Sequence, residues 1–150
     1  MRHAGSMALC IDKITGSRER NPMGNCLKVG ILGAGNIAGS MAEALNELQK
    51  EGKACAYAVA SRSQEKALEF ARKWNITRAY SSYEELASDP EVDLIYIATP
   101  HSLHYEQAKL CMEHGKNVLV EKAFTANARQ AEELFAMAEE KKVFITEAIW

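Results

Sequence analysis

The sequence lacks the features of three large classes of protein. No apolar run in its 150 residues reaches the length that a membrane-spanning helix needs. The N-terminus has no signal-peptide core, because the apolar segment Met7–Ile11 is short and Asp12 follows it. A net charge of −2 argues against a surface that binds nucleic acid or anionic membranes. We therefore expect a cytoplasmic protein whose partners include neither nucleic acid nor a membrane.

Cysteine is scarce and follows no metal-binding pattern. The four cysteines Cys10, Cys26, Cys55 and Cys111 form no CxxC, and no group of Cys and His has the spacing of a zinc site. We therefore expect no metal site, and a reducing compartment. Cys55 and Cys111 lie in apolar segments, which predicts that both are small buried residues.

What is present indicates one globular domain behind an N-terminal extension. Apolar residues make up 47% of the chain and charged residues 25%, which is ordinary for a folded domain with its own core. Residues 1–26 show no periodicity and are predicted to have little fixed structure. The natural start is open between Met1, Met7 and Met23. The domain is expected to occupy residues 27–150.

From Leu27 onward, apolar runs alternate with amphipathic stretches, which is typical of a parallel sheet with helices on both faces. Six strands are predicted, at Leu27–Leu32, Cys55–Ala60, Arg78–Tyr80, Asp93–Ala98, Asn117–Val120 and Val143–Thr146. Helices between them have start and stop signals: Ser63, the capping boxes Ser82-x-x-Glu85 and Asn127-x-x-Gln130, and Gly115 after a helix over Ser102–His114. We expect an α/β doubly wound Rossmann fold with strand order 3-2-1-4-5-6.

A glycine-rich turn follows the first strand. Gly33, Gly35, Asn36 and Ile37 lie between an apolar strand and a helix, and Ala38 completes the pattern GxGxxA. In this context Gly33 permits the tight turn, and Gly35 lets a pyrophosphate approach the backbone and the N-terminus of the helix. The alternative is a plain strand–turn–helix corner whose small residues serve packing alone.

The end of the second strand indicates which nicotinamide cofactor is used. An acidic residue there binds the ribose hydroxyls of NAD, but this strand ends in Ser61 and Arg62. A hydroxyl and a guanidinium suit the 2′-phosphate of NADP. NADP is therefore the expected cofactor, with NAD possible. The alternative is a solvated loop arginine, which does not explain the missing acid.

Two further strand ends carry polar residues. Thr99 and Pro100 follow the fourth strand, and His104 lies in the next helix. Such a histidine, which shares a helix face with Ala108 and Cys111, is more often bound to a neighbour than a catalytic base. Glu121 and Lys122 follow the fifth strand. This pair is either a surface ion pair or a lysine that hydrogen-bonds a substrate hydroxyl and assists proton transfer.

These motifs together resemble the glucose–fructose oxidoreductase/inositol dehydrogenase (Gfo/Idh/MocA) family. The resemblance rests on residues 33–38, 98–104 and 117–122, and the closing Glu147-Ala148-Ile149-Trp150 is similar to its dihydrodiol dehydrogenase-like branch. It implies an NAD(P)-binding domain of an enzyme that moves hydride between nicotinamide and a hydroxyl-bearing carbon of a sugar, polyol or dihydrodiol. It also implies roles for the residues at the strand ends: Lys122 as the catalytic residue, and Thr99, Pro100, His104 and Glu121 along the cofactor.

The sequence departs from that family in two ways. Ala123 stands where the family has a proline after the lysine, and we expect the Lys122–Ala123 bond to be trans because a non-proline cis bond costs about 3–4 kcal/mol. The family's C-terminal substrate domain is also missing, so whether this chain is itself an enzyme stays open. The rival is a non-enzymatic dinucleotide-binding or interaction module, and a weaker third reading replaces the dinucleotide by an adenosine-containing methyl donor. Ile149 and Trp150 are expected to promote a homo-oligomer.

Overall fold

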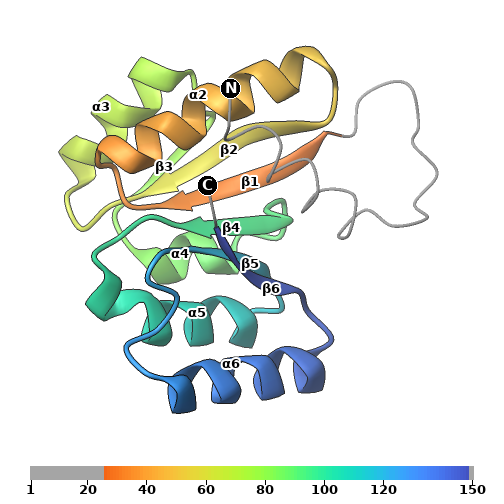
Figure 1. Ribbon diagram of the computed structural model, residues 1–150. Coiled ribbons are helices and arrows are strands. Elements are labelled where there is room, and N and C mark those ends of the chain that lie inside the picture. Colours follow the sequence, from red (N-terminus) through yellow and green to blue (C-terminus); the bar gives the residue numbers. More distant parts are fainter. Residues whose placement is uncertain (1–25, 149–150) are drawn as a thin grey trace.

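A parallel sheet of six strands forms the centre of this computed structural model, which describes residues 26–148 (Figure 1). The strands are β1 (Leu27–Leu32), β2 (Ala54–Ala60), β3 (Arg78–Tyr80), β4 (Leu94–Ile97), β5 (Asn117–Glu121) and β6 (Ile145–Ala148). Their order is β3-β2-β1-β4-β5-β6 and every neighbouring pair is parallel. The predicted fold and strand order are confirmed. The expectations for the N-terminal extension, the natural start, Ile149 and Trp150 lie outside the described residues.

Helices cover both faces of the sheet, as Figure 1 shows. One layer holds α2 (Asn36–Lys50) and α3 (Gln64–Trp74), and the other holds α4 (Tyr83–Ser88), α5 (His104–Glu113) and α6 (Ala128–Lys141). A short 3-10 helix, η1 (His101–Leu103), precedes α5. Met41 and Leu45 of α2 are fully buried on the first face, and Met112 and Leu134 are fully buried on the second. The sheet is therefore buried on both sides, which accounts for the continuous apolar runs of its central strands.

Local signals set most helix ends where the sequence predicts them. Ser63 accepts a hydrogen bond from the N–H of Lys66 (3.4 Å) at the start of α3, and Asn127 accepts one from the N–H of Gln130 (3.0 Å) at the start of α6. Ser82 caps α4 through the N–H of Glu84. Gly115 follows α5 with φ of +72°, a left-handed conformation that costs glycine little.

Several element boundaries differ from prediction: β2 begins one residue earlier, at Ala54, and β5 ends one residue later, at Glu121. The N–H of Val143 donates to Ala138 (3.0 Å) and that of Phe144 to the side chain of Asn117 (2.9 Å), so β6 begins at Ile145 and not at Val143. The fourth strand is shorter than predicted and covers Leu94–Ile97. The helix expected from Ser102 begins as η1 because its first turn closes with a bond from Leu103 N–H to Pro100 O (2.9 Å).

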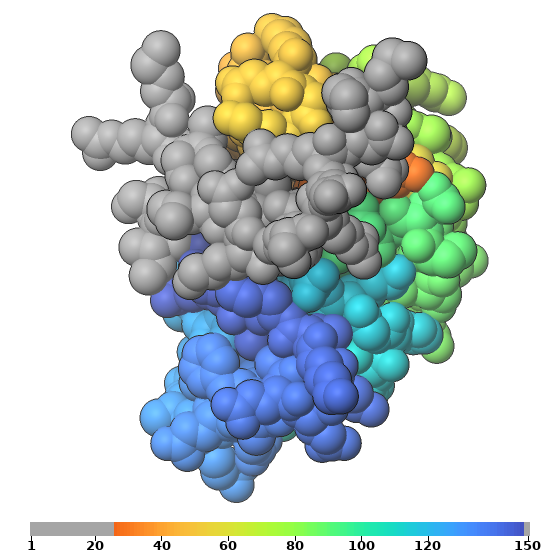
Figure 2. Space-filling model, turned by 90° about the vertical axis from the view of Figure 1, so that its right-hand side faces the viewer, coloured from red at the N-terminus to blue at the C-terminus, as the bar shows by residue number. Residues whose placement is uncertain are grey.

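The edge where the strands begin, called the amino edge below, is tied together by side chains. Asp93 accepts a hydrogen bond from the N–H of Lys28 at the start of β1 (2.9 Å). Asn117 donates to the carbonyl of Asp93 (3.1 Å) and accepts from the N–H of Phe144 (2.9 Å). These bonds connect β1, β4, β5 and β6 in sequence. Figure 2 looks onto this edge, where the yellow α2–β2 turn, the green segment before β4 and the blue segment before β6 meet the viewer.

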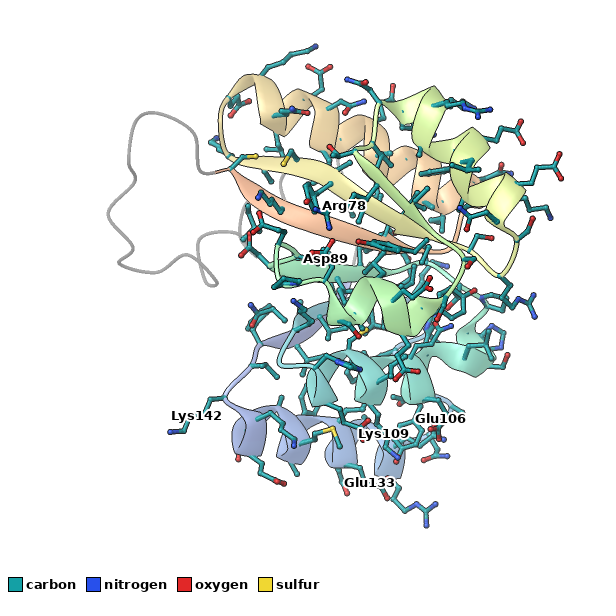
Figure 3. All side chains as sticks on the ribbon, turned by 180° about the vertical axis from the view of Figure 1, so that it is seen from behind. Arg78, Asp89, Glu106, Lys109, Glu133 and Lys142 are labelled. Carbon is teal, nitrogen blue, oxygen red and sulfur yellow. The ribbon has the colours of Figure 1, made fainter. Side chains whose placement is uncertain are left out.

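A buried cation and a buried carboxylate reinforce the same edge. The Lys116 side chain is buried, and its Nζ donates to the carbonyls of Asp89 (2.6 Å) and Val92 (2.9 Å). Burial lowers the pKa of Lys116, and the charges of Asp89 and Asp93 oppose that shift. The Asp89 carboxylate accepts from Tyr80 (2.8 Å) and pairs with Arg78 (3.2 Å), which points toward it in Figure 3. This cluster fixes the segment that leads into β4.

The pairing of β1 with β2 contains one irregularity. The register shifts between Val29 and Gly30, which pair with Ala56 and Ala58, so Tyr57 is the extra residue of a bulge. The Tyr57 ring lies 4.9 Å from Lys28 Nζ and 5.5 Å from the Arg78 guanidinium carbon. The bulge thus places an aromatic face against two cations.

No helix between residues 26 and 148 is long and apolar enough to cross a membrane.

Candidate functional site

The candidate site lies at the opposite edge of the sheet, called the carboxyl edge below, where the strands end. In the observed order β1 stands between β2 and β4, so the connections leaving β1 and β4 run in opposite directions across the sheet. Ligands of open α/β sheets bind at this switch point. The loops after β1, β2, β4 and β5 all leave this edge, and every residue predicted for the site lies in them or at their ends.

The turn after β1 has the shape that phosphate binding needs. Gly33 adopts φ of +102°, and an added Cβ would stand 2.9 Å from the carbonyl oxygen of Ala98, so a side chain is excluded on two grounds. Gly35 is the N-cap residue of α2, and a Cβ added there would meet no atom within 4 Å. The space above Gly35 is therefore open. Asn36 and Ile37 are exposed beside it.

Among the described α-helices, α2 and α5 start without a side-chain cap, but α5 continues from η1 whereas α2 begins directly after the glycine-rich turn. Side chains cap α3, α4 and α6, through Ser63, Ser82 and Asn127. In the described part of the chain, no side chain caps α2. Its first N–H groups therefore point toward the open space above Gly35, together with the positive end of the helix dipole. A phosphate would supply the acceptor that the sequence does not.

The loop after β2 places a hydroxyl and a guanidinium next to this turn. Ser61 is anchored by its N–H to the carbonyl of Tyr80 (3.2 Å), and its Oγ accepts from the N–H of Ser63 (3.3 Å). A hydroxyl that accepts one hydrogen bond can still donate another to a ligand. Arg62 is exposed, and none of the ion pairs formed among residues 26–148 uses it. This pair can bind a phosphate group.

A surface pocket of about 630 Å³ borders the same loop on the β3 side. It lies between the end of β3 and α4, and it is lined by Gln64, Ala79, Tyr80, Ser81, Ser82, Glu84, Glu85 and Ser88. Two carboxylates make this pocket unfavourable for a phosphate. The Ser61–Arg62 side of the loop is therefore the better anion site.

His104 joins the loops that follow β4 and β5. Its Nδ1 lies 2.8 Å from the carbonyl oxygen of Ala123, and its Nε2 lies 2.9 Å from that of Thr99. The ring is buried, with 1% of its surface exposed. The Thr99 hydroxyl donates to Gln107, and Pro100 is exposed at the rim. The structure brings Thr99 and His104 together, and His104 bridges two loops. That Thr99, Pro100 and His104 line the cofactor stays a prediction.

Glu121 and Lys122 have different environments although they are neighbours. Glu121 is buried, accepts a hydrogen bond from the Tyr96 hydroxyl, and accepts another from the N–H of Lys122 (3.3 Å). Burial, and then the hydrogen bond to Glu121, raises the pKa of Tyr96. Lys122 is exposed at the carboxyl edge. The carboxylate therefore holds the backbone in place, while the lysine is available to a ligand.

The Lys122–Ala123 peptide bond is cis, so the expectation of a trans bond is wrong. Contacts from three elements define the backbone path at this point. The N–H groups of Lys122 and Phe124 donate to the carboxylates of Glu121 and of Glu147 in β6 (3.0 Å for Phe124). The Ala123 carbonyl oxygen lies against the His104 ring. Tertiary contacts therefore outweigh the local preference of a non-proline residue.

Sequence reasoning missed two contributors to the site. Tyr96 lies inside the apolar run of β4, where its hydroxyl is the one polar side-chain group and the signal that could have identified it. Gln107 lies on α5 one turn after His104, and its carbonyl oxygen is met by Thr99. Tyr96 lies in an apolar strand and Gln107 in the middle of a helix, and such positions normally indicate packing alone.

Three comparisons with known proteins agree on the kind of domain. Residues 27–148 match the sequence profile of a family described as an oxidoreductase family with an NAD-binding Rossmann fold. Over 124 residues the chain is 45% identical to trans-1,2-dihydrobenzene-1,2-diol dehydrogenase of Mus musculus. This match covers 83% of this chain and 37% of that protein. It is 40% identical over 133 residues to D-xylose 1-dehydrogenase (NADP(+)) of Hypocrea jecorina, covering 83% of this chain and 34% of that protein.

Among solved structures, a 3-ketoreductase from Actinomadura kijaniata in complex with NADP and TDP-benzene superimposes with a TM-score of 0.74 and 33% identity. The match covers 82% of this chain and 37% of the reductase. The chain therefore spans little more than a third of the length of the relatives that it matches.

Proposed function

Because this chain belongs to the oxidoreductase family with an NAD-binding Rossmann fold, we propose that it is the NADP-binding domain of a dehydrogenase. The reaction is hydride transfer between the nicotinamide and a hydroxyl-bearing carbon of a sugar, polyol or dihydrodiol. The relatives named for dihydrodiol and D-xylose dehydrogenases support this range of substrates.

One observation carries the proposal. The N-terminus of α2 has no side-chain cap within the described residues, and the space above Gly35 is open. Both features suit a pyrophosphate, because its oxygens accept hydrogen bonds from free N–H groups and need room to approach the backbone. Gly33, Gly35, Asn36 and Ile37 would hold this group.

The loop after β2 supports NADP over NAD. Ser61 and Arg62 would bind the 2′-phosphate through a hydroxyl and a charge-assisted hydrogen bond. An acidic side chain, which would repel that phosphate, is missing from residues 61–63. The relative that is named an NADP(+)-dependent dehydrogenase and the NADP complex of the similar reductase support this choice.

The bound cofactor supplies the hydride chemistry, and the chain supplies binding and orientation. Lys122 is the proposed catalytic residue, because its exposed Nζ can donate to the substrate oxygen and assist loss of the hydroxyl proton. Glu121 and Tyr96 would hold the backbone on which Lys122 stands. Thr99 and Pro100 would line the cofactor, with His104 fixing their loop.

Isothermal calorimetry with NADP(H) and NAD(H) tests the cofactor assignment. We expect tighter binding of NADP(H), by about ten- to a hundredfold, because one charge-assisted contact contributes roughly 1.5–3 kcal/mol. Arg62→Ala should remove this preference and leave NAD(H) binding unchanged. Arg72→Ala is the matched control, since Arg72 is an exposed arginine in the last turn of α3. Equal affinities of the wild-type protein for the two cofactors would refute the assignment.

A second function, dinucleotide binding without catalysis, is favoured by the exposure of Lys122 and Arg62. An open site leaves the reacting atoms in water and loses the low-dielectric surroundings that make electrostatic catalysis effective. We expect this 150-residue chain, assayed by itself, to bind NADPH and to show little or no turnover of polyols or dihydrodiols. A cofactor-dependent absorbance change at an ordinary enzymatic rate would exclude the non-catalytic alternative.

A further inference from the structure

Two cysteines meet at the amino edge of the sheet, far from the candidate site. Cys26 is the residue before β1, and Cys55 is the second residue of β2. Their Sγ atoms lie 2.7 Å apart, and both are free thiols. The sequence separates them by 29 residues, so the sheet brings them together.

Strand pairing fixes this approach. Leu27 pairs with Ala54 and Lys28 with Cys55 in the parallel register of β1 and β2. The N–H of Leu27 also donates to the carbonyl of Lys53 (3.0 Å). The backbone on both sides of the thiol pair is therefore held by hydrogen bonds.

The two thiols differ in their access to solvent. Cys55 is buried, with 8% of its surface exposed, whereas Cys26 is half-buried. A dissolved reagent therefore reaches Cys26 first. Cys111 is fully buried in the core between the sheet and α5, which makes it an internal reference for an inert thiol.

We propose that Cys26 and Cys55 are a redox modification site, at which a reversible disulfide connects the start of β1 to β2. The bond would add β2 to the strands that Asp93 and Asn117 already tie together at this edge. It would enclose β1, α2 and the beginning of β2, including the Gly33–Ala38 turn, in one covalent loop.

The oxidant is a small disulfide such as oxidised glutathione, and two exchange steps complete the reaction. In the first, the Cys26 thiol loses its proton, its sulfur bonds to one sulfur of the oxidant, and the other sulfur leaves as a thiolate that takes up a proton. In the second, the Cys55 thiol loses its proton, its sulfur bonds to Cys26 Sγ, and the second thiolate leaves and is protonated. The two cysteines are oxidised, and one disulfide is reduced to two thiols.

Burial of Cys55 makes the second step the slower one. Burial, followed by the contact with Cys26, raises the pKa of Cys55 to about 12, while Lys28 acts in the opposite direction and Asp93 in the same one. Only a thiolate attacks a disulfide, and a buried thiol forms it rarely. A mixed disulfide at Cys26 is thus the expected first product, and closure follows it.

The test incubates the folded chain with oxidised glutathione, blocks remaining thiols with N-ethylmaleimide in acid, and maps the peptides by mass spectrometry. We expect a linked pair that contains Cys26 and Cys55 and is lighter than the two reduced peptides by two hydrogen atoms. Dithiothreitol should separate the pair. The melting temperature of the oxidised chain should be higher, because a closed loop restricts the unfolded state.

Three variants make the result decisive. Cys55→Ser should stop the reaction at the mixed disulfide on Cys26 and abolish the rise in melting temperature. Cys111→Ser and Cys10→Ser should each leave the linked pair unchanged. Recovery of Cys55 as a blocked thiol beside a fully modified Cys26, or a link from Cys26 to Cys10 or to a second chain, would overturn the proposal.

Discussion

The two edges of the sheet differ in what their polar side chains do. At the amino edge, side chains of Asp93, Asn117 and Lys116 bond to backbone groups of neighbouring strands and loops. At the carboxyl edge, the start of α2 has no side-chain cap in the described structure, and Arg62 and Lys122 are exposed. The amino edge thus uses polar side chains to hold backbone groups, whereas the carboxyl edge leaves Arg62 and Lys122 in solvent.

The carboxyl edge also has side chains that hold the backbone: Glu121 and Glu147 accept hydrogen bonds from the N–H groups of Lys122 and Phe124. His104 bridges the loops after β4 and β5 through two backbone carbonyls. These loops carry Thr99 and Lys122, and the proposed function requires both residues to be held in place. His104 thus fixes the loops that carry Thr99 and Lys122, whereas the phosphates are proposed to bind at the loops after β1 and β2.

The largest expected effect is a loss of stability at the amino edge. Asn117→Ala removes the hydrogen bonds to Asp93 and Phe144, so it should lower the free energy of unfolding by about 2 kcal/mol in urea titrations. Asn46→Ala is the matched control, because its amide reaches, within the described part of the chain, only the carbonyl of Trp74 at 3.5 Å. NADPH affinity should not change. A loss of affinity in Asn117→Ala with stability preserved would contradict the division between the edges.

The next effect is a loss of binding at the carboxyl edge. Gly35→Ala places a Cβ in open space, so stability should change by less than about 1 kcal/mol. The same Cβ occupies the approach of the pyrophosphate, so NADPH affinity should fall at least about tenfold, roughly 1.4 kcal/mol. Calorimetry and urea unfolding measure the two quantities. Gly33→Ala is the contrasting variant, since its Cβ meets Ala98 and both quantities should fall. Unchanged affinity in Gly35→Ala would argue against phosphate binding at this turn.

The smallest effect concerns pH. Burial by itself raises the pKa of the Asp89 carboxyl, but the N–H of Glu91, the Tyr80 hydroxyl and the charges of Arg78 and Lys116 together hold that pKa below its ordinary value of 3.8. A lowered pKa in the folded state stabilises the protein above pH 3.8, and this stability is lost as the pH falls through the folded value.

The stability difference between the wild-type protein and Asp89→Asn should therefore be constant near neutral pH and shrink below about pH 4. Urea unfolding at a series of pH values measures it. Glu69→Gln is the control, because Glu69 is an exposed carboxylate on α3 that takes part in none of the ion pairs among residues 26–148. A difference that grows in acid would contradict the lowered pKa.

Much of the fold could be predicted because its signals are local. The apolar run Leu27–Leu32 and the short segment Arg78–Tyr80 were predicted as strands with the bounds that the structure has, and Ser63 and Asn127 marked helix starts. The bounds of β6 could not be predicted in this way. The side chain of Asn117, 27 residues away, takes the N–H of Phe144 out of the strand.

The sequence predicted at which edge of the sheet the candidate site residues lie, but not the contacts that they make there. Strand ends identified Gly33, Arg62 and Lys122, because parallel strands carry their ligand-binding loops on one edge. The cis bond at Lys122–Ala123 and the approach of Cys26 to Cys55 were not predictable. Both depend on partners that are distant in sequence, and no composition or spacing within one segment encodes them.

Among residues 26–148 no side chain caps the start of α2, and this has a consequence for how fast the protein is degraded. On the proposed function, the cofactor's pyrophosphate completes the helix, so the bound dinucleotide is also a structural component. A ligand present at a hundred times its dissociation constant stabilises the folded state by about 2.7 kcal/mol. Proteases that cleave opened chains would then act about a hundredfold more slowly on the loaded protein. The abundance of this protein would therefore follow the supply of its cofactor.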